Sequence, residues 1–522
     1  MDCNKIQSAN MMIKRALQIL LLSATGIAAG NAQTPDLTDG IKTSVEMSGT
    51  LSDGHYSPLW LNANKYGLSS IERNSGYIRG GVYRSAVNDS LRKWDVGYGV
   101  DIAVAANHSS TFRIQQLYAD VKWMKGLLTV GQKQQPMQLK NNELSSGSQT
   151  LGINSLPYPE IRLALPNYWH IPGTKGFLSI KGHVAYGMLT DNSFEKDFVH
   201  GTSSYNKNTL MHSKAGYLKL GKDEKPFSVE AGVEMASQFG GTRYAYDKGV
   251  YTETKMESGF SSFWHALAGG GTDSSTDGAI KNNEGNMLGS WLLRVNYETK
   301  TAKFGLYADQ FFEDHSGMFH LDYDGYANEN GKIVKKDNKY LFYPLKDIML
   351  GADMHLKNFR YISDVVVEYM YTKYQSGPVY VDRTLNFTDH IGGRDDYYNN
   401  STFSGWQHWG RAIGNPLYIS PEYNTDGSLS FQCNRFVAWH LGMSGNPTED
   451  LHYRLLTTIQ KGWGTYRKPY IDPRNNFSFV LEASYNLHKL YEGVSIGAAF
   501  GFDRGQLLGN NTGGTLTIKF ER

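Results

Sequence analysis

Apolar and polar residues alternate strictly in many stretches of this sequence, which is the pattern of β-strands whose two faces meet different surroundings. In residues 94–106, Val100 and Ile102 fall on one face while Gly99 and Asp101 fall on the other. The same scheme recurs towards the end of the chain. The pattern therefore predicts a protein built mainly of strands with one apolar and one small or polar face.

Eighteen such stretches can be drawn, and the connections between them mostly alternate in length. Connections after even-numbered strands are short, such as 299–300, and several after odd-numbered strands are long, such as 239–287 and 375–433. Bacterial outer-membrane barrels have tight periplasmic turns and long extracellular loops. This rhythm would place both termini in the periplasm. The predicted strands lie near residues 41–50, 76–86, 94–106, 114–124, 126–133, 159–165, 177–189, 213–220, 226–238, 288–298, 301–312, 346–357, 361–374, 434–445, 451–461, 476–487, 492–503 and 513–520.

The composition favours a membrane barrel over a soluble β-sandwich. The polar faces carry glycine, serine and single carboxylates, whereas a sandwich shows long charged residues to water, especially lysine on its edge strands. With Gly 56, Tyr 34 and Trp 10 against Pro 15, and 40% hydrophobic residues, the chain is rich in glycine and aromatics without being apolar. The predicted fold class is an all-β transmembrane antiparallel β-barrel of about 18 strands, and a soluble all-β protein is the alternative.

Residues 1–32 predict a secretory signal peptide, with Lys14 and Arg15 ahead of an apolar stretch and small residues before the cleavage site. The remaining barrel domain, 33–522, contains one cysteine, Cys433, so no internal disulfide is expected. A net charge of +2 argues against nucleic-acid binding. We expect a monomer in the cell outer membrane, surrounded by outer-membrane lipid and inserted by the barrel-assembly machinery.

Two stretches could form a plug in the lumen that a barrel of this size leaves open. Residues 57–67 have proline near a possible helix start and glycine near its end, which predicts a short helix. Such a helix could lie on the periplasmic side, and 41–50 would then not be a wall strand. Residues 134–175 hold five of the 15 prolines and are predicted to be mostly loop, folded inward.

Several strings, which together cover nearly the whole exported chain, resemble the capsule-assembly Wzi family of outer-membrane proteins. They are PLWLNANKYGLSS (58–70), LKNNELSSG (139–147), PNYWHIPGTKGFLSIKGHVAYGMLTD (166–191), HSKAGYLKLG (212–221), DDYYNN (395–400), GWQHWGRAIGNPL (405–417) and SYNLHK (484–489). The resemblance implies an eighteen-stranded barrel with a helical periplasmic plug. It also implies a lectin that holds capsular polysaccharide on the cell surface.

The connection 375–433 is the candidate carbohydrate-binding segment, because it combines aromatic rings with planar hydrogen-bonding groups. Sugars stack their C–H faces on rings, and their hydroxyls pair with carboxylates, amides and guanidinium groups. The alternative is that this segment packs on itself or into the lumen, with its tryptophans as a small core. The candidate residues are Arg394, Asp395, Asp396, Tyr397, Tyr398, Asn399, Trp406, His408, Trp409 and Arg411.

Ionisable residues on the predicted inner faces form a second candidate group. They could brace the wall as ion pairs, because charges withdrawn from water are usually paired. They could also line a narrow pore, so a saccharide-permeable porin is the alternative function. These lumen-facing residues are Asp101, Asp120, Lys122, Glu230, Glu234, Arg294, Asp353, His355, Glu368, His440 and Arg454.

An outer-membrane hydrolase is a third interpretation. Asp395 and Asp396 could act with His408, and His183, His212, His315 and His440 are also present, but the sequence contains no G-x-S-x-G motif. We therefore predict a protein that is not an enzyme, without catalytic residues, metal ligands or cofactors. Its predicted function is to bind or retain capsular or extracellular polysaccharide at the cell surface.

Overall fold

The computed structural model divides the chain into two units, Met1–Gly40 and Ile41–Arg522. Residues 37–40 of the first unit form a turn, and the description below concerns the second unit. The predicted signal peptide at 1–32 and the candidate Arg394 lie outside the described residues. The structure describes residues 37–86, 93–268, 272–274, 280–282, 285–313, 318, 326–327, 333–334, 347–375 and 395–522.

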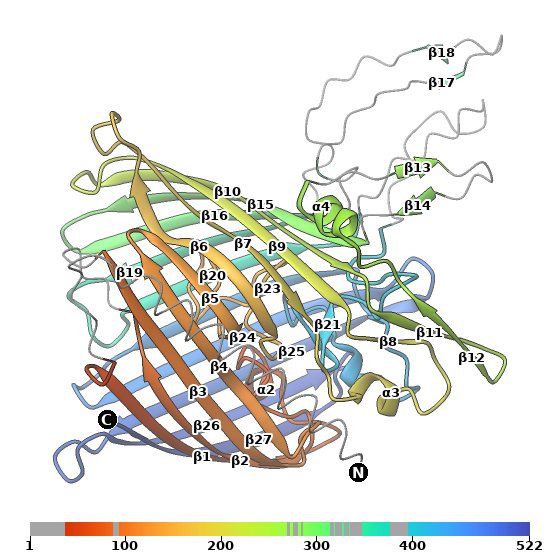
Figure 1. Ribbon diagram of the computed structural model, residues 1–522. Helices are drawn as coiled ribbons and strands as arrows, with labels where there is room; N and C mark the ends of the chain where they lie inside the picture. Colours follow the sequence, from red (N-terminus) through yellow and green to blue (C-terminus); the bar gives the residue numbers. More distant parts are fainter. Residues whose placement is uncertain are drawn as a thin grey trace. The chain divides into compact units, whose positions relative to one another are not determined.

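One antiparallel sheet of 18 strands closes on itself to form a barrel (Figure 1). Each wall strand pairs with the next one along the chain, and β1 pairs with both β2 and β27, so that Met47 lies opposite Ile78 and Ile518. Closure leaves no free sheet edge. The wall strands are Ile41–Asp53 (β1), Asn74–Arg84 (β2), Trp94–Ala106 (β3), Phe112–Trp123 (β4), Gly126–Gln132 (β5), Pro159–His170 (β6), Leu178–Met188 (β7), Leu210–Leu220 (β9), Phe227–Phe239 (β10), Asn286–Glu298 (β15), Ala302–Glu313 (β16), Ile348–Leu356 (β19), Asp364–Tyr371 (β20), Phe436–Gly445 (β23), Leu451–Gly464 (β24), Pro469–Asn486 (β25), Val494–Gly505 (β26) and Asn511–Glu521 (β27).

The remaining elements lie in the connections between wall strands. None of the helices in the described part of the chain is long and apolar enough to cross a membrane. These elements are Leu59–Asn62 (α2), Phe194–Phe198 (α3), Tyr205–Lys207 (β8), Thr242–Asp247 (β11), Val250–Lys255 (β12), Phe260–Ala268 (α4), Thr272–Ser274 (β13), Ile280–Asn282 (β14), Tyr326–Ala327 (β17), Ile333–Val334 (β18), Gln407–His408 (β21), Arg411–Ala412 (β22) and the 3-10 helix Pro421–Tyr423 (η1).

The prediction of about 18 strands is confirmed, and each predicted stretch overlaps one wall strand. The alternation has the expected cause. In β3, Val100, Ile102 and Val104 are exposed on the outer surface, whereas Asp101 and Ala103, which lie between them, are buried. Because successive side chains of a strand point to opposite faces, this pattern separates the membrane side of the wall from the lumen.

The outer surface of the wall is apolar. Large exposed hydrophobic residues at outward positions include Val104, Leu163, Leu306, Ile459 and Leu516. Aromatic residues gather near the ends of the strands, as in the girdles that flank the lipid-facing band of outer-membrane barrels. Those exposed near one rim are Trp123, Phe227, Tyr297, Tyr485 and Phe520, and those near the other are Phe112 and Trp439.

Long and short connections emerge at opposite rims of the barrel. Connections after odd-numbered wall strands, such as 240–285 and 372–435, share one rim, which we call the loop rim. Connections after even-numbered strands share the other rim, which we call the turn rim, and the longest of these spans only 85–93. The first wall strand begins and the last one ends at the turn rim. By the usual arrangement of bacterial barrels, the loop rim faces the outside of the cell.

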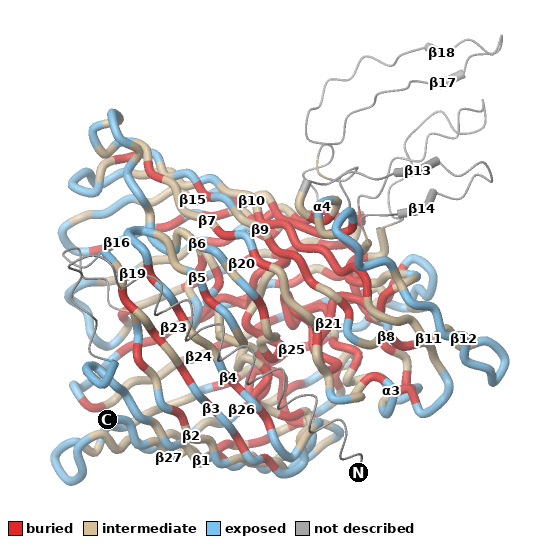
Figure 2. Tube along the Cα trace, in the orientation of Figure 1, coloured by how far each residue is buried: buried red, intermediate tan, exposed pale blue. Residues whose placement is uncertain are grey.

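Three segments that start at the loop rim fold back into the lumen, and we call them together the plug. They are residues 54–73, 133–158 and 395–435. Their apolar side chains form one core with inward residues of the wall, which Figure 2 shows as a concentration of buried positions inside the barrel. The expectation that residues 134–175 are mostly loop and folded inward is correct as far as residue 158.

From residue 159 the chain forms wall strand β6, as the alternation predicted for 159–165, so the expectation of a loop fails here. The register between β6 and β7 shifts between Leu165 and Trp169. Pro166 lies at this shift, where a residue without a backbone N–H costs the ladder least. Some prolines of 134–175 therefore lie in an irregular strand and others in a loop.

The helix expected within 57–67 is present as the single turn α2, and all four of its residues are buried. Gly67 ends this stretch with φ +70°, and a Cβ there would lie 2.5 Å from the backbone nitrogen of Leu156. The helix follows β1 at the loop rim, so the possibility that it lies on the periplasmic side is wrong. Residues 41–53 form wall strand β1, which confirms the predicted strand at 41–50 and excludes the alternative that was tied to a periplasmic helix.

Candidate functional site

A cavity of about 520 Å³ lies at the loop rim, and we call it the rim cavity. Its walls come from the ends of β15 and β16, the region of β8 and β11, the third plug segment and the connection 465–468. Most of the lining side chains carry amides, hydroxyls or charges. They include Ser204, Asn206, Arg243, Asn286, Glu313, Asp395, Asp396, Asn399, Asn400, Ser401, Phe403, Ser404, Ser430, Phe431, Gln432, Arg467 and Lys468.

Asn399 and Asp396 are held in fixed orientations on one side of the cavity. The Asn399 amide donates to the Phe431 carbonyl at 3.0 Å, and its oxygen accepts from the Phe431 N–H at 2.8 Å. The Asp396 carboxylate accepts from the Asn434 amide at 2.7 Å. Asp396 and Tyr398 adopt φ values of +49° and +69°, a left-handed conformation that non-glycine residues keep only where the surroundings enforce it.

Asn400 ties the same segment to the barrel wall. Its amide donates to the side-chain oxygen of Asn286, at the start of β15, over 3.1 Å. Its own oxygen accepts from the backbone N–H groups of Thr402 and Phe403, at 2.8 and 3.1 Å, which forms an Asx turn. Residues 399–403 are therefore positioned by side chains rather than by regular secondary structure.

Glu195 of α3 lies behind the cavity and joins the connection 189–209 to the plug. Its carboxylate accepts hydrogen bonds from the Ser404 hydroxyl (2.5 Å), the Gln407 amide (2.7 Å) and the Asn206 backbone N–H (2.9 Å). Burial raises the pKa of Glu195 to about 7, because loss of water outweighs the three donors that favour the charged form. This carboxyl therefore titrates near neutral pH.

The plug buries most of the aromatic candidates. Tyr397, Tyr398 and Trp406 are fully buried. The Tyr398 ring stacks on that of Tyr418 with centroids 4.0 Å apart, and the Trp406 indole N–H donates to the Thr150 carbonyl at 2.9 Å. The prediction that these rings bind a sugar is corrected: the alternative of packing into the lumen describes them, since plug segments without regular structure need large rings to fill their core.

Three further candidates of this segment, His408, Trp409 and Arg411, are also buried and form hydrogen bonds inside the barrel. The two ring nitrogens of His408 lie 2.7 and 3.0 Å from the carbonyls of Leu156 and Thr190. Trp409 donates to the Thr190 carbonyl at 3.0 Å, and Arg411 donates to the Asn62 carbonyl at 3.0 Å. His408 and Arg411 join the third plug segment to the other two, and Trp409 joins it to the connection 189–209, which favours packing over ligand contact for all three. Asp395, Asp396 and Asn399 do line the cavity.

The inward ionisable residues are partnered. Arg294 and Asp353 form a bidentate pair at 2.6 and 2.8 Å, and Glu368, His440 and Arg454 contact the second plug segment. Such pairs brace the lumen, as one of the two interpretations of these residues expected. The other pairs are Asp101 with Arg79, Asp120 with Lys133, Glu230 with Tyr168, Glu234 with Tyr217, and His355 with Asp364, while Lys122 is buried on the same inner face.

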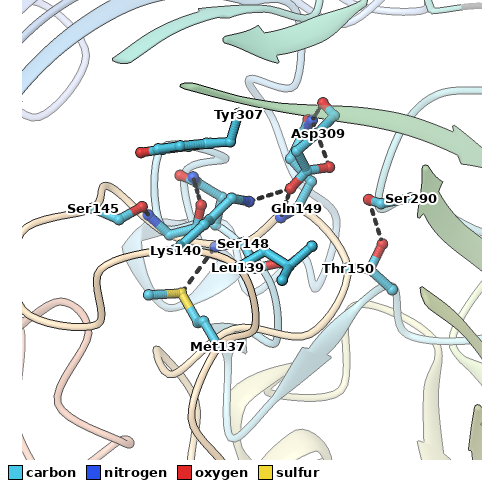
Figure 3. Close-up of polar contacts among 12 residues, drawn as sticks. Met137, Leu139, Lys140, Ser145, Ser148, Gln149, Thr150, Ser290, Tyr307 and Asp309 are labelled. Carbon is cyan, nitrogen blue, oxygen red and sulfur yellow. Dashed lines mark hydrogen bonds and ion pairs between the residues drawn. The ribbon is translucent and has the colours of Figure 1, made fainter. Parts of the chain in front are cut away.

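The second plug segment is fixed to the wall by buried polar contacts (Figure 3). Lys140 forms an ion pair with Asp309 of β16, in which both side chains are buried. The Gln149 amide donates to the Asp309 carbonyl at 2.8 Å, and the hydroxyls of Thr150 and Ser290 lie 2.8 Å apart. A buried charge left without its partner is costly, so these contacts hold the plug in one position.

In the described part of the chain no group of three or more His, Cys, Asp or Glu residues is placed to hold a metal ion. Cys433 is buried and free.

No protein-family model and no curated protein matches the sequence. Among solved structures, the chain is similar to Wzi of Escherichia coli, an outer-membrane protein involved in group 1 capsule assembly that is described as a carbohydrate-binding β-barrel. The TM-score is 0.50 and the identity 13%, over 91% of this chain and 84% of Wzi. This likeness, the closed sheet and its apolar exterior agree on the fold. The chain is an outer-membrane β-barrel.

Two further solved barrels are similar at lower scores. OccAB4 of Acinetobacter baumannii has a TM-score of 0.43 and 7% identity, over 94% of this outer-membrane barrel and 100% of that chain. OprD of Pseudomonas aeruginosa has a TM-score of 0.43 and 8% identity, over 94% and 97%.

Some residues around the rim cavity of this outer-membrane barrel were missed from the sequence. Glu195 and Asn206 come from the connection 189–209, and Arg243 comes from β11, far from the candidate segment in the chain. No spacing links these residues to Asn399. The only indication in the sequence was that these residues belong to long connections. Long connections that leave the same rim of a barrel can meet in space.

Proposed function

We propose that this outer-membrane barrel binds capsular or extracellular polysaccharide at the cell surface and retains it there, with the rim cavity as the binding site. The observation that carries the proposal is the rim cavity, which lies at the loop rim and is lined by fixed amides, carboxylates and hydroxyls. Its volume of about 520 Å³ falls within the range of ordinary ligand sites. The loop rim is the end that we assign to the outside.

Hydrogen bonding, more than ring stacking, would recognise the sugar. Hydrogen bonds of the Asn399 and Asn400 side chains fix this part of the cavity wall before any ligand arrives, which lowers the entropic cost of binding. Phe403 and Phe431 reach the cavity but are themselves buried, so they offer little ring face. Arg243, together with Arg467 and Lys468 of the connection 465–468, provides cations for an acidic polymer.

The likeness to the carbohydrate-binding Wzi barrel of Escherichia coli supports the same proposal, as do the strings that resemble the Wzi family. Membership of that family is part of the proposal. A carbohydrate-binding role agrees with a barrel whose lumen holds a packed plug and whose polar cavity lies at the rim.

The plug argues against a saccharide-permeable porin. A diffusion channel needs an open lumen, whereas here the ion pair between Lys140 and Asp309 holds an inserted segment to the wall. A hydrolase built on Asp395, Asp396 and His408 has less support, because both ring nitrogens of His408 contact backbone carbonyls instead of an activated hydroxyl. We therefore favour binding without turnover.

Retention of polysaccharide by cells tests this proposal. Ser430 is exposed and lines the rim cavity, so Ser430→Trp should obstruct the cavity without removing a plug contact of a core residue. Thr425, exposed on the same segment and outside the lining, supplies the control Thr425→Trp. At equal barrel levels, cell-bound polysaccharide should fall in the first strain and stay normal in the second. Equal retention in both strains would refute the site.

A further inference from the structure

Helix α4 packs against the outside of the barrel wall near the loop rim (Figure 1). The Tyr186 hydroxyl of β7 donates to the Phe263 carbonyl of α4 at 2.7 Å. The Phe263 ring meets the rings of Tyr186 and Phe239, with centroids 5.2 and 5.1 Å apart. Ser262 and Ala266 are buried on the same side of the helix. One face of α4 is therefore fixed to β7, β9 and β10.

The alternation of the strands identifies this wall surface as the membrane side. Tyr186 shares a strand face with Val184, which is exposed, and Phe239 shares one with Phe227, which is also exposed. Glu234 lies on the opposite face of β10 and lines an internal cavity. Since side chains of a strand alternate between two faces, α4 covers outward positions.

Lys214 shows how the helix is attached. Lys214 lies on the outward face of β9, the face that carries the exposed Leu218. Its ammonium group donates to the carbonyls of Ala266 and Leu267 in the last turn of α4. The last carbonyls of a helix lack partners within it and attract cations. The contact satisfies these carbonyls and holds the end of α4 to the outward face of β9.

Another side of α4 carries an exposed apolar stripe, next to the polar Ser261 and His265. Phe260 and Trp264 are four residues apart, so they share one stripe of the helix. They are 88% and 57% exposed. Val184 and Leu218, on the outward faces of the strands that α4 contacts, are exposed and belong to the lipid-facing band of the wall. Phe112 and Trp439 are exposed near the same rim, at the level where aromatic side chains meet the membrane surface.

We propose that α4 is an interfacial membrane helix whose Phe260 and Trp264 enter the outer leaflet of the lipid bilayer. The partner is the lipid surface. One face of α4 then packs on the wall, and its apolar stripe lies in lipid. The helix thereby anchors the connection 240–285 to the membrane surface. That connection also contains the hairpin of β11 and β12, and Arg243 of this hairpin lines the rim cavity. The anchor therefore limits how far one wall of the cavity can move.

Spin labels on the full barrel in phospholipid vesicles test the proposal. Single cysteines are placed at Phe260→Cys and at Trp264→Cys in a Cys433→Ala background, and collisions with oxygen, which concentrates in lipid, are compared with those of a water-soluble nickel chelate. Leu293→Cys, on the exposed outer face of β15, gives the lipid reference. Val250→Cys, exposed at the start of β12, gives the water reference.

We expect the ratio of oxygen to nickel collisions at both helix positions to resemble that at position 293 and to exceed that at position 250 severalfold. Ratios equal to that at position 250 would overturn the proposal. So would spin–spin broadening that disappears when labelled protein is diluted with unlabelled protein, because a second copy of the chain would then cover this face. Heat-modifiable mobility in gel electrophoresis identifies the variants that fold. If only one of the two helix variants folds, its collision ratio alone decides the outcome.

Discussion

The hydroxyl of Ser145, in the second plug segment, donates a 2.5 Å hydrogen bond to the carboxylate of Glu368 on wall strand β20. The Ser146 backbone N–H donates to the other carboxylate oxygen at 2.8 Å, and the Tyr307 hydroxyl donates to the first at 2.5 Å. All these groups are buried. One wall carboxylate thus satisfies three donors, two of which belong to the plug.

Replacing this carboxylate should loosen the plug. Glu368→Ala leaves three buried donors without an acceptor, and we expect a loss of about 3 kcal/mol in the free energy of unfolding. Urea unfolding of the barrel in detergent measures it. Asp364→Ala is the matched control on the same strand, because its partner His355 is partly exposed, and should cost less than about 1 kcal/mol. Equal effects of the two variants would show that Glu368 does not anchor the plug.

Trp406 separates packing from ligand contact. Because its ring is fully buried in the plug core, Trp406→Ala should lower the free energy of unfolding by about 3–5 kcal/mol. Val250→Ala, on the exposed hairpin, should change it by less than about 0.5 kcal/mol. A Trp406→Ala barrel of normal stability that had lost polysaccharide binding would restore Trp406 as a ligand residue.

Glu195 predicts a pH dependence. Its folded-state pKa is raised from 4.5 to about 7, so the folded protein binds this proton more tightly than the unfolded chain does. The contribution to stability is therefore complete below about pH 4.5, decreases as the pH rises towards 7, and is constant above that. From ~1.4 kcal/mol per tenfold change in proton affinity, the decrease is roughly 3 kcal/mol.

Urea unfolding between pH 4.5 and 8 measures this effect as the difference between wild type and Glu195→Gln, which cannot ionise. Asp197→Asn, an exposed carboxylate of the same helix, should keep the slope of wild type. The assignment fails if Glu195→Gln has the same dependence on pH as the other two proteins.

The plug predicts low conductance. In planar bilayers the intact barrel should show no steady ion current, since Lys140, Gln149 and Thr150 hold the second plug segment to the wall. Replacing residues 138–148 by a glycine-serine linker should produce long-lived current steps. Steady conductance by the unmodified barrel would favour the porin alternative instead.

The wall could be predicted from the sequence because its signal is local. Val100, Asp101 and Ile102 alternate between apolar and polar because successive side chains of β3 point to the lipid and to the lumen in turn. Neighbouring residues are therefore enough to identify the strand and its two faces. The rhythm of short and long connections then gave the two rims. Helix α4 and the hairpin of β11 and β12 were missed, because they lie within a connection that was recognised only by its length.

The site was predicted less well because its geometry depends on contacts between distant segments. Asp396 and Asn399 were named and do line the rim cavity, whereas Trp406 and Arg411 from the same segment turn into the plug. A tryptophan that contacts a sugar and one that fills a core have the same sequence signature. Burial decides between them, and burial of Trp406 depends on Thr150, 256 residues away in the chain.

Direct titration of polysaccharide into the purified barrel tests the central claim. The probe is polysaccharide isolated from the surface of the strain that expresses the chain, and the proteins are wild type, Ser401→Trp, Ser430→Trp and Thr425→Trp. Both lining serines are exposed in the rim cavity, so we expect their variants to lose at least tenfold in affinity while Thr425→Trp binds as wild type does. Equal affinity of all four proteins, or no binding by wild type, would contradict the account.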